Sequence, residues 1–307
     1  MNLTDAEIVT IEVNALLDVL FHRAGYDFRN YSRASLLRRL EFFTEQEGFK
    51  KISDLIPMVI HDEPLTRRLI KGLLINVTEM FRDPAFFKTL TEDVFPVLKT
   101  YPFFKIWHAG CSTGEEVYSL AILLQEHGLL GRARIYGTDL NAQIIKKAKD
   151  GIFKESDIHA YAENYVAAGG QRQLTDYFYS RYGSAKINDE LTRNITFASH
   201  NLVSDGIFTE VQMIICRNVM IYFDTNLKQK VIGLFYQGLT PGGLLCLGSK
   251  ESLNYSEDAS CFETMSLDSR IYKKQISSAK QVSKANSNID VSAEIKARPN
   301  VGQLHAF

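Results

Sequence analysis

The sequence has no long apolar segment and no excess of either charge. No apolar run approaches the roughly 18 residues that a membrane-spanning helix needs. Its 35 Lys and Arg residues nearly balance its 36 Asp and Glu residues, which leaves a formal charge of −1. A general nucleic-acid-binding protein would carry a basic excess. These absences predict a protein with no nucleic-acid partner and no membrane insertion.

Cysteine and histidine, the residues that most often hold zinc or form disulfides, are few and scattered. The four cysteines form no Cys-x-x-Cys pair, and the seven histidines do not cluster at metal-ligand spacing. Cys216 and Cys246 lie inside apolar runs, a position typical of buried thiols in a reducing compartment. The first seven residues are acidic and lack the basic start of a secretory signal. We therefore expect a cytoplasmic protein with no metal site and no disulfide.

Hydrophobic residues make up 45% of the 307 residues, enough to fill one large core or two modest ones. Through residues 1–75 they recur at helical spacing, without an alternating strand pattern. This stretch therefore predicts an all-α N-terminal domain. The clearest positions are Ile8, Ile11, Leu16, Leu17 and Leu20 in one segment, and Leu36, Leu37, Leu40 and Phe43 in the next.

From about residue 104 the pattern changes to short apolar runs that alternate with helical stretches. The runs, at 104–109, 135–138, 195–198, 213–216 and 244–248, have the length of strands. Helical patterns fall between several of them, at 115–125 and 142–149. Such alternation is typical of crossover units on a mostly parallel sheet. The fold class predicted is α/β, with the helical domain followed by a Rossmann-like domain over residues 76–275.

Two further segments depart from this alternation. Residues 165–193 contain Gly169-Gly170 and a tyrosine-rich stretch, which predicts a small antiparallel β-insertion in the form of a hairpin. Residues 276–307 hold five Ser and five Ala but a single aromatic residue, Phe307. They cannot bury enough apolar surface to offset the entropy of ordering, so we expect a disordered tail.

The segment most informative about chemistry is a glycine loop between a predicted strand and a predicted helix. Gly110 and Gly114 lie in this loop, where a nucleotide-like ligand approaches the backbone of a doubly wound sheet. Glu115 and Glu116 follow at the helix start, where a dinucleotide would place its pyrophosphate, so an anionic ligand is disfavoured. A cationic ligand such as S-adenosylmethionine suits the site better. The alternative is that the two acids only favour the helix dipole, and the pair alone does not separate these interpretations.

Asp139 ends the next predicted strand, 25 residues after Gly114. A carboxylate at this place accepts hydrogen bonds from the ribose hydroxyls of an adenosine group. The alternative is that Asp139 caps the helix that follows at Asn141 and Ala142. The glycine loop and the acid together favour nucleoside binding.

Three segments resemble the chemotaxis receptor methyltransferases of the CheR family. They are Asn-Val-Thr-Glu-Met-Phe-Arg-Asp at 76–83, Cys-Ser-Thr-Gly-Glu-Glu-Val-Tyr-Ser at 111–119 and Cys-Arg-Asn-Val-Met-Ile-Tyr-Phe-Asp at 216–224. The resemblance extends over about residues 5–273, and Val117 departs from it where the family usually has proline. It implies an S-adenosylmethionine-dependent protein-glutamate O-methyltransferase. The expected products are glutamate methyl esters on chemoreceptors, and S-adenosylhomocysteine.

The resemblance also implies roles for individual residues. Tyr222 would lie near the acceptor. We expect Arg82 to orient the acceptor carboxylate, because a guanidinium matches the fork of a carboxylate, which makes these two the expected catalytic residues. Taken alone, Tyr222 would more often belong to a core, and Asn76 or Thr78 would more often cap a helix. The acceptor glutamate is ionised at neutral pH, so no general base is required. The implied cofactor-binding residues are Asn76, Thr78, Arg82, Glu116, Asp139, Asn201, Leu202, Arg217 and Asn218.

The implied partners are the cytoplasmic domains of chemoreceptors. Family members dock on acidic receptor helices through a basic helix, and Arg29, Arg33, Arg38 and Arg39 are the residues here that could do so. The alternative for such a charge run is a solvated face. Some members also capture a receptor's C-terminal pentapeptide on the β-insertion, but the turn at 182–186 is short and lacks paired glycines. We therefore expect independence from that tether.

Two other functions stay open at the level of sequence. The same methyl transfer could act on a signalling protein outside chemotaxis. The chain could also be an S-adenosylmethionine-binding interaction module without catalysis.

Overall fold

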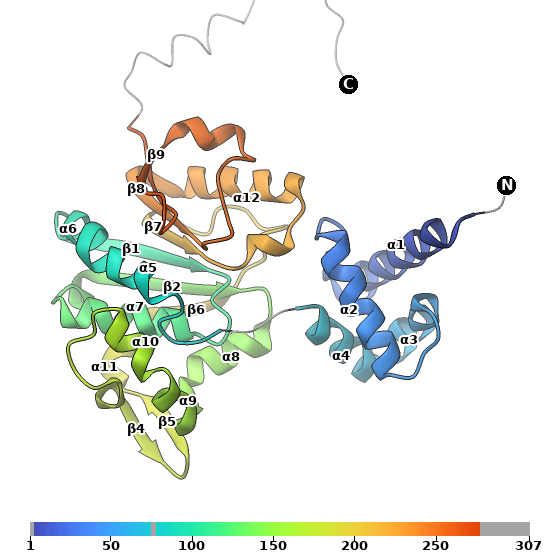
Figure 1. Cartoon of the computed structure of the whole chain (residues 1–307), viewed down its shortest axis with the longest axis horizontal. Coiled ribbons are helices and arrows are strands. Elements are labelled where there is room, and N and C mark those ends of the chain that lie inside the picture. The colour runs from blue at the N-terminus through green and yellow to red at the C-terminus, as the bar shows by residue number, and fades with distance from the viewer. Residues whose placement is uncertain (1–2, 75–77, 277–307) are drawn as a thin grey trace, which may run out of the picture. The chain divides into compact units, whose positions relative to one another are not determined.

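The structure is a computed structural model that describes residues 3–74 and 78–276 (Figure 1). The predicted fold class is confirmed: an all-α N-terminal region precedes a Rossmann-like domain with a small antiparallel sheet. The predicted disordered tail, from residue 277 onward, and the predicted site residue Asn76 lie outside the described residues. Within the described ranges, no helix combines the length and the apolar character needed to cross a membrane.

The N-terminal region is built from amphipathic helices that share one apolar core. Thr4 and Glu7 form a reciprocal capping box at the first helix, and Gly25 ends it in the left-handed conformation. Leu16, Leu20 and Leu36 are fully buried between the helices. The elements are α1 (Asp5–Ala24), α2 (Arg33–Gln46), η1 (Ile52–Asp54), α3 (Leu55–His61) and α4 (Glu63–Leu73).

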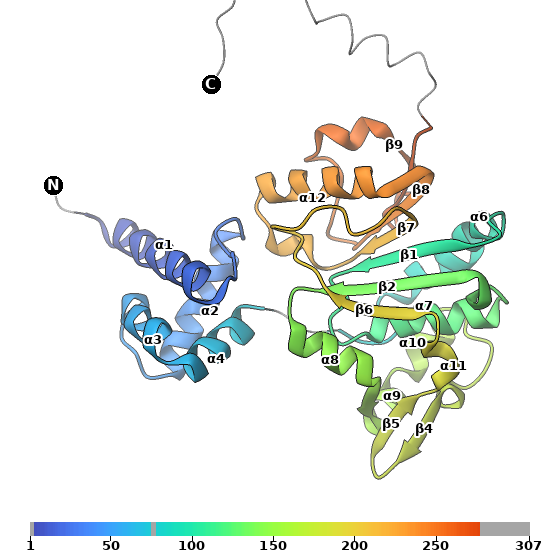
Figure 2. The same cartoon turned by 180° about the vertical axis from the view of Figure 1, so that it is seen from behind.

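The Rossmann-like domain has a seven-stranded sheet in the order β6-β2-β1-β7-β8-β10-β9 (Figure 2). Its strands are β1 (Phe104–Ala109), β2 (Ala133–Asp139), β6 (Ile195–Ser199), β7 (Val211–Cys216), β8 (Leu239–Leu247), β9 (Phe262–Ser266) and β10 (Ile271–Lys274). The first five pair in parallel, and the last two join the β8 edge antiparallel. Because β1 lies between β2 and β7, the strand order reverses there, and a ligand crevice forms at such a reversal.

Helices cover both faces of this sheet, because its strands carry apolar side chains on both faces and these must be shielded from water. Ile106 of β1 packs into the cluster formed with α5, α6 and α7, whereas Trp107 beside it packs against α12. The helical elements are α5 (Pro84–Thr89), η2 (Leu90–Val94), α6 (Phe95–Leu98), α7 (Glu115–Glu126), η3 (Leu130–Arg132), α8 (Ala142–Asp150), η5 (Met220–Tyr222), α12 (Thr225–Gly238) and η6 (Glu257–Cys261). The carboxyl ends of β1, β2 and β7 are thereby held at one edge of the sheet.

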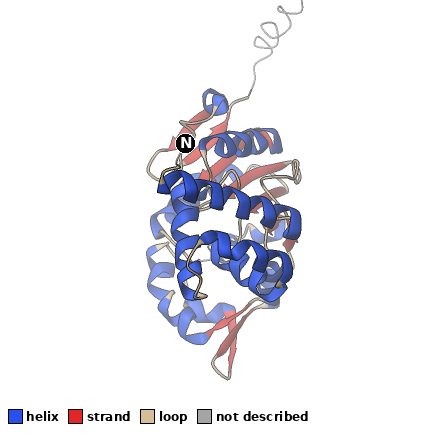
Figure 3. Cartoon of the chain, turned by 90° about the vertical axis from the view of Figure 1, so that its right-hand side faces the viewer, coloured by secondary structure: helices blue, strands red, loops and turns tan. Residues whose placement is uncertain are grey.

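The β-insertion is larger than the predicted hairpin. The hairpin exists as β4 (Phe178–Arg181) and β5 (Ser184–Ile187), and Figure 3 shows it projecting beyond the helices. A third strand, β3 (Ile152–Lys154), lies before residue 165 and pairs with β5. Its three residues are too few to show an alternating pattern. The helical elements of this part are α9 (Glu155–Ala160), α10 (Ala162–Ala167), η4 (Leu174–Tyr177) and α11 (Asp189–Thr192).

Candidate functional site

A pocket opens at the carboxyl ends of β1, β2 and β7 and is also lined by residues of the N-terminal helices. Every predicted site residue that the structure describes lines this one pocket. These residues are Thr78, Arg82, Glu116, Asp139, Asn201, Leu202, Arg217, Asn218 and Tyr222. Residues separated by more than 140 positions in the sequence are thus brought together where an open α/β sheet binds its ligand.

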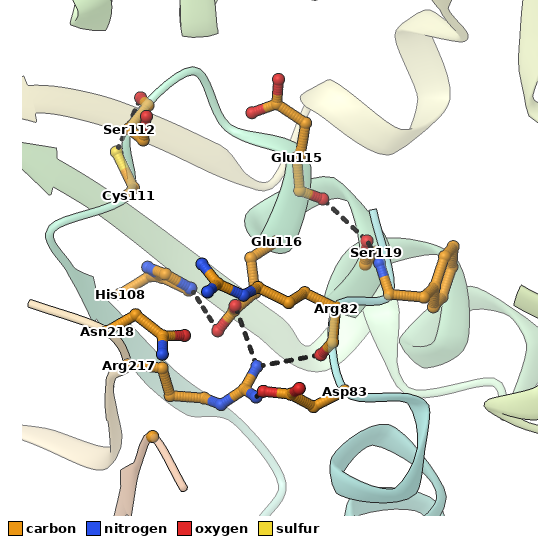
Figure 4. Close-up of polar contacts among 12 residues, drawn as sticks. Arg82, Asp83, His108, Cys111, Ser112, Glu115, Glu116, Ser119, Arg217 and Asn218 are labelled. Carbon is orange, nitrogen blue, oxygen red and sulfur yellow. Dashed lines mark hydrogen bonds and ion pairs between the residues drawn. The ribbon is translucent and has the colours of Figure 1, made fainter. Parts of the chain in front are cut away.

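A network of charged and polar side chains lies at the pocket, with His108, Glu116 and Arg217 buried and Asp83 exposed (Figure 4). Arg217 follows β7 and donates to Glu116 at the start of α7 (2.9 Å) and to the Asp83 carboxylate (2.7 Å). Glu116 also contacts His108 Nε2, 3.1 Å away. Because a carboxylate only accepts, Nε2 must carry the proton in this contact. The network joins β1, α7, β7 and the segment before α5.

Glu116 stays ionised in this network although it is buried. Burial alone would raise its pKa, but the charge of Arg217 and the hydrogen bond from His108 lower the pKa to about 2. The acid at the second position of α7 is therefore a fixed negative charge at the pocket. Its neighbour Glu115 is buried elsewhere and accepts from the Thr113 hydroxyl.

The backbone that carries Arg82 is strained and held on both sides. Phe81 and Asp83 have φ angles of 55° and 57°, in the left-handed region that residues other than glycine rarely adopt. The Phe81 N–H donates to Ser119 Oγ (2.9 Å), and Arg217 donates to the Arg82 carbonyl (3.3 Å). Strain of this kind persists only where neighbouring contacts fix it, and it gathers at functional sites. Arg82 is thus presented to the pocket from a fixed turn.

Asp139 is the last residue of β2, and its carboxylate is tied to two loops. It accepts from the Ser112 N–H (3.0 Å) in the glycine loop and from the Asn141 N–H (3.0 Å). Asn141, not Asp139, caps α8, so the capping alternative for Asp139 is wrong. Burial raises the pKa of Asp139, and its backbone hydrogen bonds offset part of that rise. The carboxylate retains lone pairs that can accept further hydrogen bonds.

The glycine loop needs glycine at position 110. Gly110 has a φ angle of 77°, and a Cβ added there would lie 2.4 Å from a methyl carbon of Val219. Ser112 in the same loop is also left-handed, with φ of 49°. The loop therefore packs closely against the turn after β7, and these two segments form adjoining walls of the pocket.

The N-terminal helices supply residues that the sequence analysis did not place in the site. Ser32 N–H donates to the Tyr222 carbonyl (2.8 Å), and the Tyr31 and Phe223 rings meet edge to face. Arg39 was predicted as part of a basic docking row, but it lies in the pocket with its guanidinium 4.9 Å from the centre of the Tyr222 ring. Arg39 therefore differs in its surroundings from the other three arginines named for receptor docking, and the docking role of these residues stays a prediction.

The other members of that row differ in their partners. Arg33 contacts Asn14, and Arg29 pairs with Asp27 and Asp18 before α2 begins. Arg29, Arg33 and Arg38 remain exposed. Helical periodicity could have separated Arg39 from Arg38, because Arg39 lies three residues after buried Leu36 and four before buried Phe43.

The residues present fit S-adenosylmethionine. Glu116 and Asp139 place two carboxyl groups in the pocket, which also contains Arg39, Arg82 and Arg217, and carboxylates suit a sulfonium and an ammonium. Among the described residues, several buried polar atoms at the pocket have no hydrogen-bond partner, as expected of a site built for a polar ligand. They are Arg39 Nε, His108 Nδ1, Ser112 Oγ, His200 Nδ1, Arg217 Nε and Asn218 Oδ1. His108 and His200 were not singled out from sequence, and only their positions at strand ends could have suggested them.

Comparison with known proteins agrees with this geometry. Residues 76–271 match the SAM-binding domain of CheR methyltransferases, and residues 11–74 match the all-alpha domain of CheR methyltransferases.

Three relatives cover most of the chain. A Pseudomonas putida protein named Cher3 is 43% identical, over 89% of this chain and 100% of its own. Chemotaxis protein methyltransferase 2 of Vibrio cholerae is 30% identical, over 77% and 84%. The chemotaxis protein methyltransferase of Salmonella typhimurium is 27% identical, over 78% and 83%. The chain therefore belongs to the CheR methyltransferase family.

Proposed function

We propose that this protein methylates glutamate side chains of chemoreceptor cytoplasmic domains, using S-adenosylmethionine and releasing S-adenosylhomocysteine. The observation that carries the proposal is the joint lining of one pocket. The fixed negative charge of Glu116 and the carboxyl group of Asp139 lie in the same cavity as Arg82 and Tyr222. A cationic methyl donor and an anionic acceptor are thus each given groups of opposite charge. The relatives named for chemotaxis support chemoreceptors as the acceptor class.

The residues divide between holding the cofactor and receiving the acceptor. Asp139 would accept from the ribose hydroxyls, and Asn201 and Leu202 would border the adenine. Thr78, Glu116 and Asn218 would hold the methionine end, with Arg217 fixing Glu116. Asn76 belongs to the same proposed set. When bound, S-adenosylmethionine supplies an electrophilic methyl group on a sulfonium.

The protein's task is then mostly alignment. Arg82 would orient the incoming glutamate, because a guanidinium matches the fork of a carboxylate. Tyr222 would form the adjacent wall, held by Arg39 and by the Ser32 N–H. The acceptor carboxylate is already ionised at neutral pH, so the residues need only bring it into line and exclude water.

Asp139→Ala is expected to weaken the binding of S-adenosylmethionine and S-adenosylhomocysteine alike. Loss of hydrogen bonds to a charged acceptor should reduce both affinities by roughly 10- to 100-fold. Calorimetric titration of the two ligands measures this. Asp189→Ala, at an exposed acid of the β-insertion, is the control and should bind as the wild type does. Unchanged affinity in Asp139→Ala would remove Asp139 from the site.

Methylation of purified chemoreceptor cytoplasmic domains, followed by mass mapping of the modified residues, tests the function itself. We expect base-labile methyl esters on glutamates. We also propose that docking does not depend on a C-terminal pentapeptide, because the β4–β5 turn has only Tyr182 and Gly183 between its strands. Receptors with and without that terminus should therefore be methylated at similar rates.

Other outcomes of this assay separate the alternatives. Methylation that collapses when the receptor terminus is removed would contradict tether independence and leave the chemistry standing. Esters on other signalling proteins, with none on receptors, would change the acceptor. Cofactor binding without transfer to any acceptor would favour the interaction module.

A further inference from the structure

Glu251 is a buried carboxylate that lies beside the pocket without lining it. It is 5% exposed and follows β8, the strand next to β7. Its two oxygens accept four backbone N–H groups from two loops. Oε1 accepts from Val219 (3.0 Å) and Met220 (2.7 Å), and Oε2 accepts from Asn218 (3.0 Å) and Gly248 (2.6 Å). One side chain thus satisfies three successive amides of the turn after β7.

These bonds hold a backbone conformation that is unfavourable by itself. Asn218 has a φ angle of 59°, in the left-handed region. Gly248 approaches from the other loop so closely that an added Cβ would lie 2.9 Å from the Asn218 nitrogen. The turn therefore packs against the Gly248 backbone and is held by the same carboxylate that accepts from the Gly248 N–H. Such strain persists only because the surrounding contacts determine it.

The same turn forms a wall of the pocket. Asn218 and Val219 both line it, and Val219 is the residue against which Gly110 packs. Arg217 precedes them and anchors Glu116 and Asp83. A shift of the turn would therefore move the Asn218 side chain, the adjoining glycine loop and the charge network together.

Glu251 acts in its ionised form. All four of its hydrogen-bond partners are N–H donors, so a protonated carboxyl would have no acceptor among them for its own proton. Burial raises the pKa of Glu251, and the four backbone bonds offset part of that rise. A glutamine of the same shape could not replace it, because its amide N–H₂ would face N–H donors.

We propose that Glu251 is a positioning residue for the cofactor pocket: by accepting the amides of residues 218–220 it fixes Asn218 and Val219 in the conformation that binds S-adenosylmethionine. This inference rests on the proposed function for the identity of the ligand. It assigns to Glu251 no contact with the cofactor and no step of the reaction.

The first test compares the affinity of S-adenosylhomocysteine for the full-length wild type and Glu251→Gln by calorimetry. We expect affinity to fall about tenfold or more, and the KM for S-adenosylmethionine to rise with it. Glu126→Gln is the matched control. Glu126 is also a partly buried carboxylate, which accepts from Tyr177 Oη (2.7 Å) and the Gln171 N–H (3.1 Å) outside the pocket. Glu126→Gln removes a carboxylate charge outside the pocket and should leave the affinity unchanged, which separates positioning by Glu251 from a general effect of losing a partly buried charge.

Wild-type affinity in a folded Glu251→Gln protein would overturn the inference. If that variant does not fold, hydrogen exchange of the ligand-free wild type decides. The amides of Asn218, Val219, Met220 and Gly248 should exchange slowly without cofactor, because Glu251 already binds them. Exchange at the rate of an open loop would contradict the inference. A wild-type protein that binds no S-adenosylhomocysteine would instead contradict the proposed function. The exchange experiment would then still show whether Glu251 binds the amides of residues 218–220.

Discussion

Arg217→Met is expected to cost the Rossmann-like domain about 3–5 kcal/mol of unfolding free energy at neutral pH. The guanidinium is buried, with 1% of its side chain exposed, between Glu116 and Asp83 and 4.0 Å from the centre of the Phe86 ring. Methionine fills a similar volume but leaves the Glu116 carboxylate buried beside only His108. It also releases the Arg82 carbonyl and Asp83, so the strained turn loses one of its two anchors.

The penalty should depend on pH in a definite direction. The pKa of Glu116 is lowered to about 2 in the folded protein from the ordinary value of 4.5. Its stabilising contribution is therefore fully present above 4.5 and is lost as the pH falls through 2. The difference between wild type and Arg217→Met should accordingly shrink between pH 4.5 and pH 2.

Urea denaturation of both proteins at neutral and acidic pH measures this difference. Arg193→Met, at an exposed arginine outside the pocket, is the control and should change stability little at either pH. A penalty for Arg217→Met below about 1 kcal/mol at neutral pH would show that the buried pair is not held as the structure describes.

Arg82→Ala is expected to lower the rate of methyl transfer about 100-fold or more at saturating cofactor. The reason is the loss of alignment, since a small displacement of a reacting group can cost this much. Arg82→Lys should recover only part of the rate, because an ammonium cannot form the two-pronged contact of a guanidinium. Because Arg82 is one of several residues proposed to hold the cofactor, the affinity of Arg82→Ala for S-adenosylmethionine should change less than its rate of methyl transfer.

Initial rates of methylation of a receptor domain measure the loss of turnover, and calorimetric titration with the cofactor measures the loss of affinity separately. Arg193→Ala is again the control and should react at the wild-type rate. A wild-type rate for Arg82→Ala would mean that Arg82 neither orients the acceptor nor holds the cofactor.

The sequence alone predicts the sheet and the position of the pocket because local patterns encode them. The apolar runs correspond to β1, β2, β6, β7 and β8, and the glycine loop and Asp139 lie at strand ends as their spacing indicates. The short strand β3 was missed because three residues carry no periodicity. The antiparallel strands β9 and β10 were missed as well.

Contacts between distant segments could not be predicted in this way. The hydrogen bond between Arg217 and Glu116 joins positions 101 residues apart. The sequence around either residue predicts its secondary structure but not its partner. Glu251 follows a serine and a lysine in a loop, where an acid is ordinarily solvated. Its burial depends on the close approach of two loops, so it becomes visible only in three dimensions.

A single-turnover experiment tests the central claim most directly. The enzyme is loaded with one equivalent of methyl-labelled S-adenosylmethionine and mixed with a chemoreceptor cytoplasmic domain in excess. We expect the label to move to receptor glutamates as base-labile esters, and transfer from Arg82→Ala to be slower although the label is bound. Label that stays on the cofactor in the wild type, or that appears on residues other than glutamate, would contradict that claim.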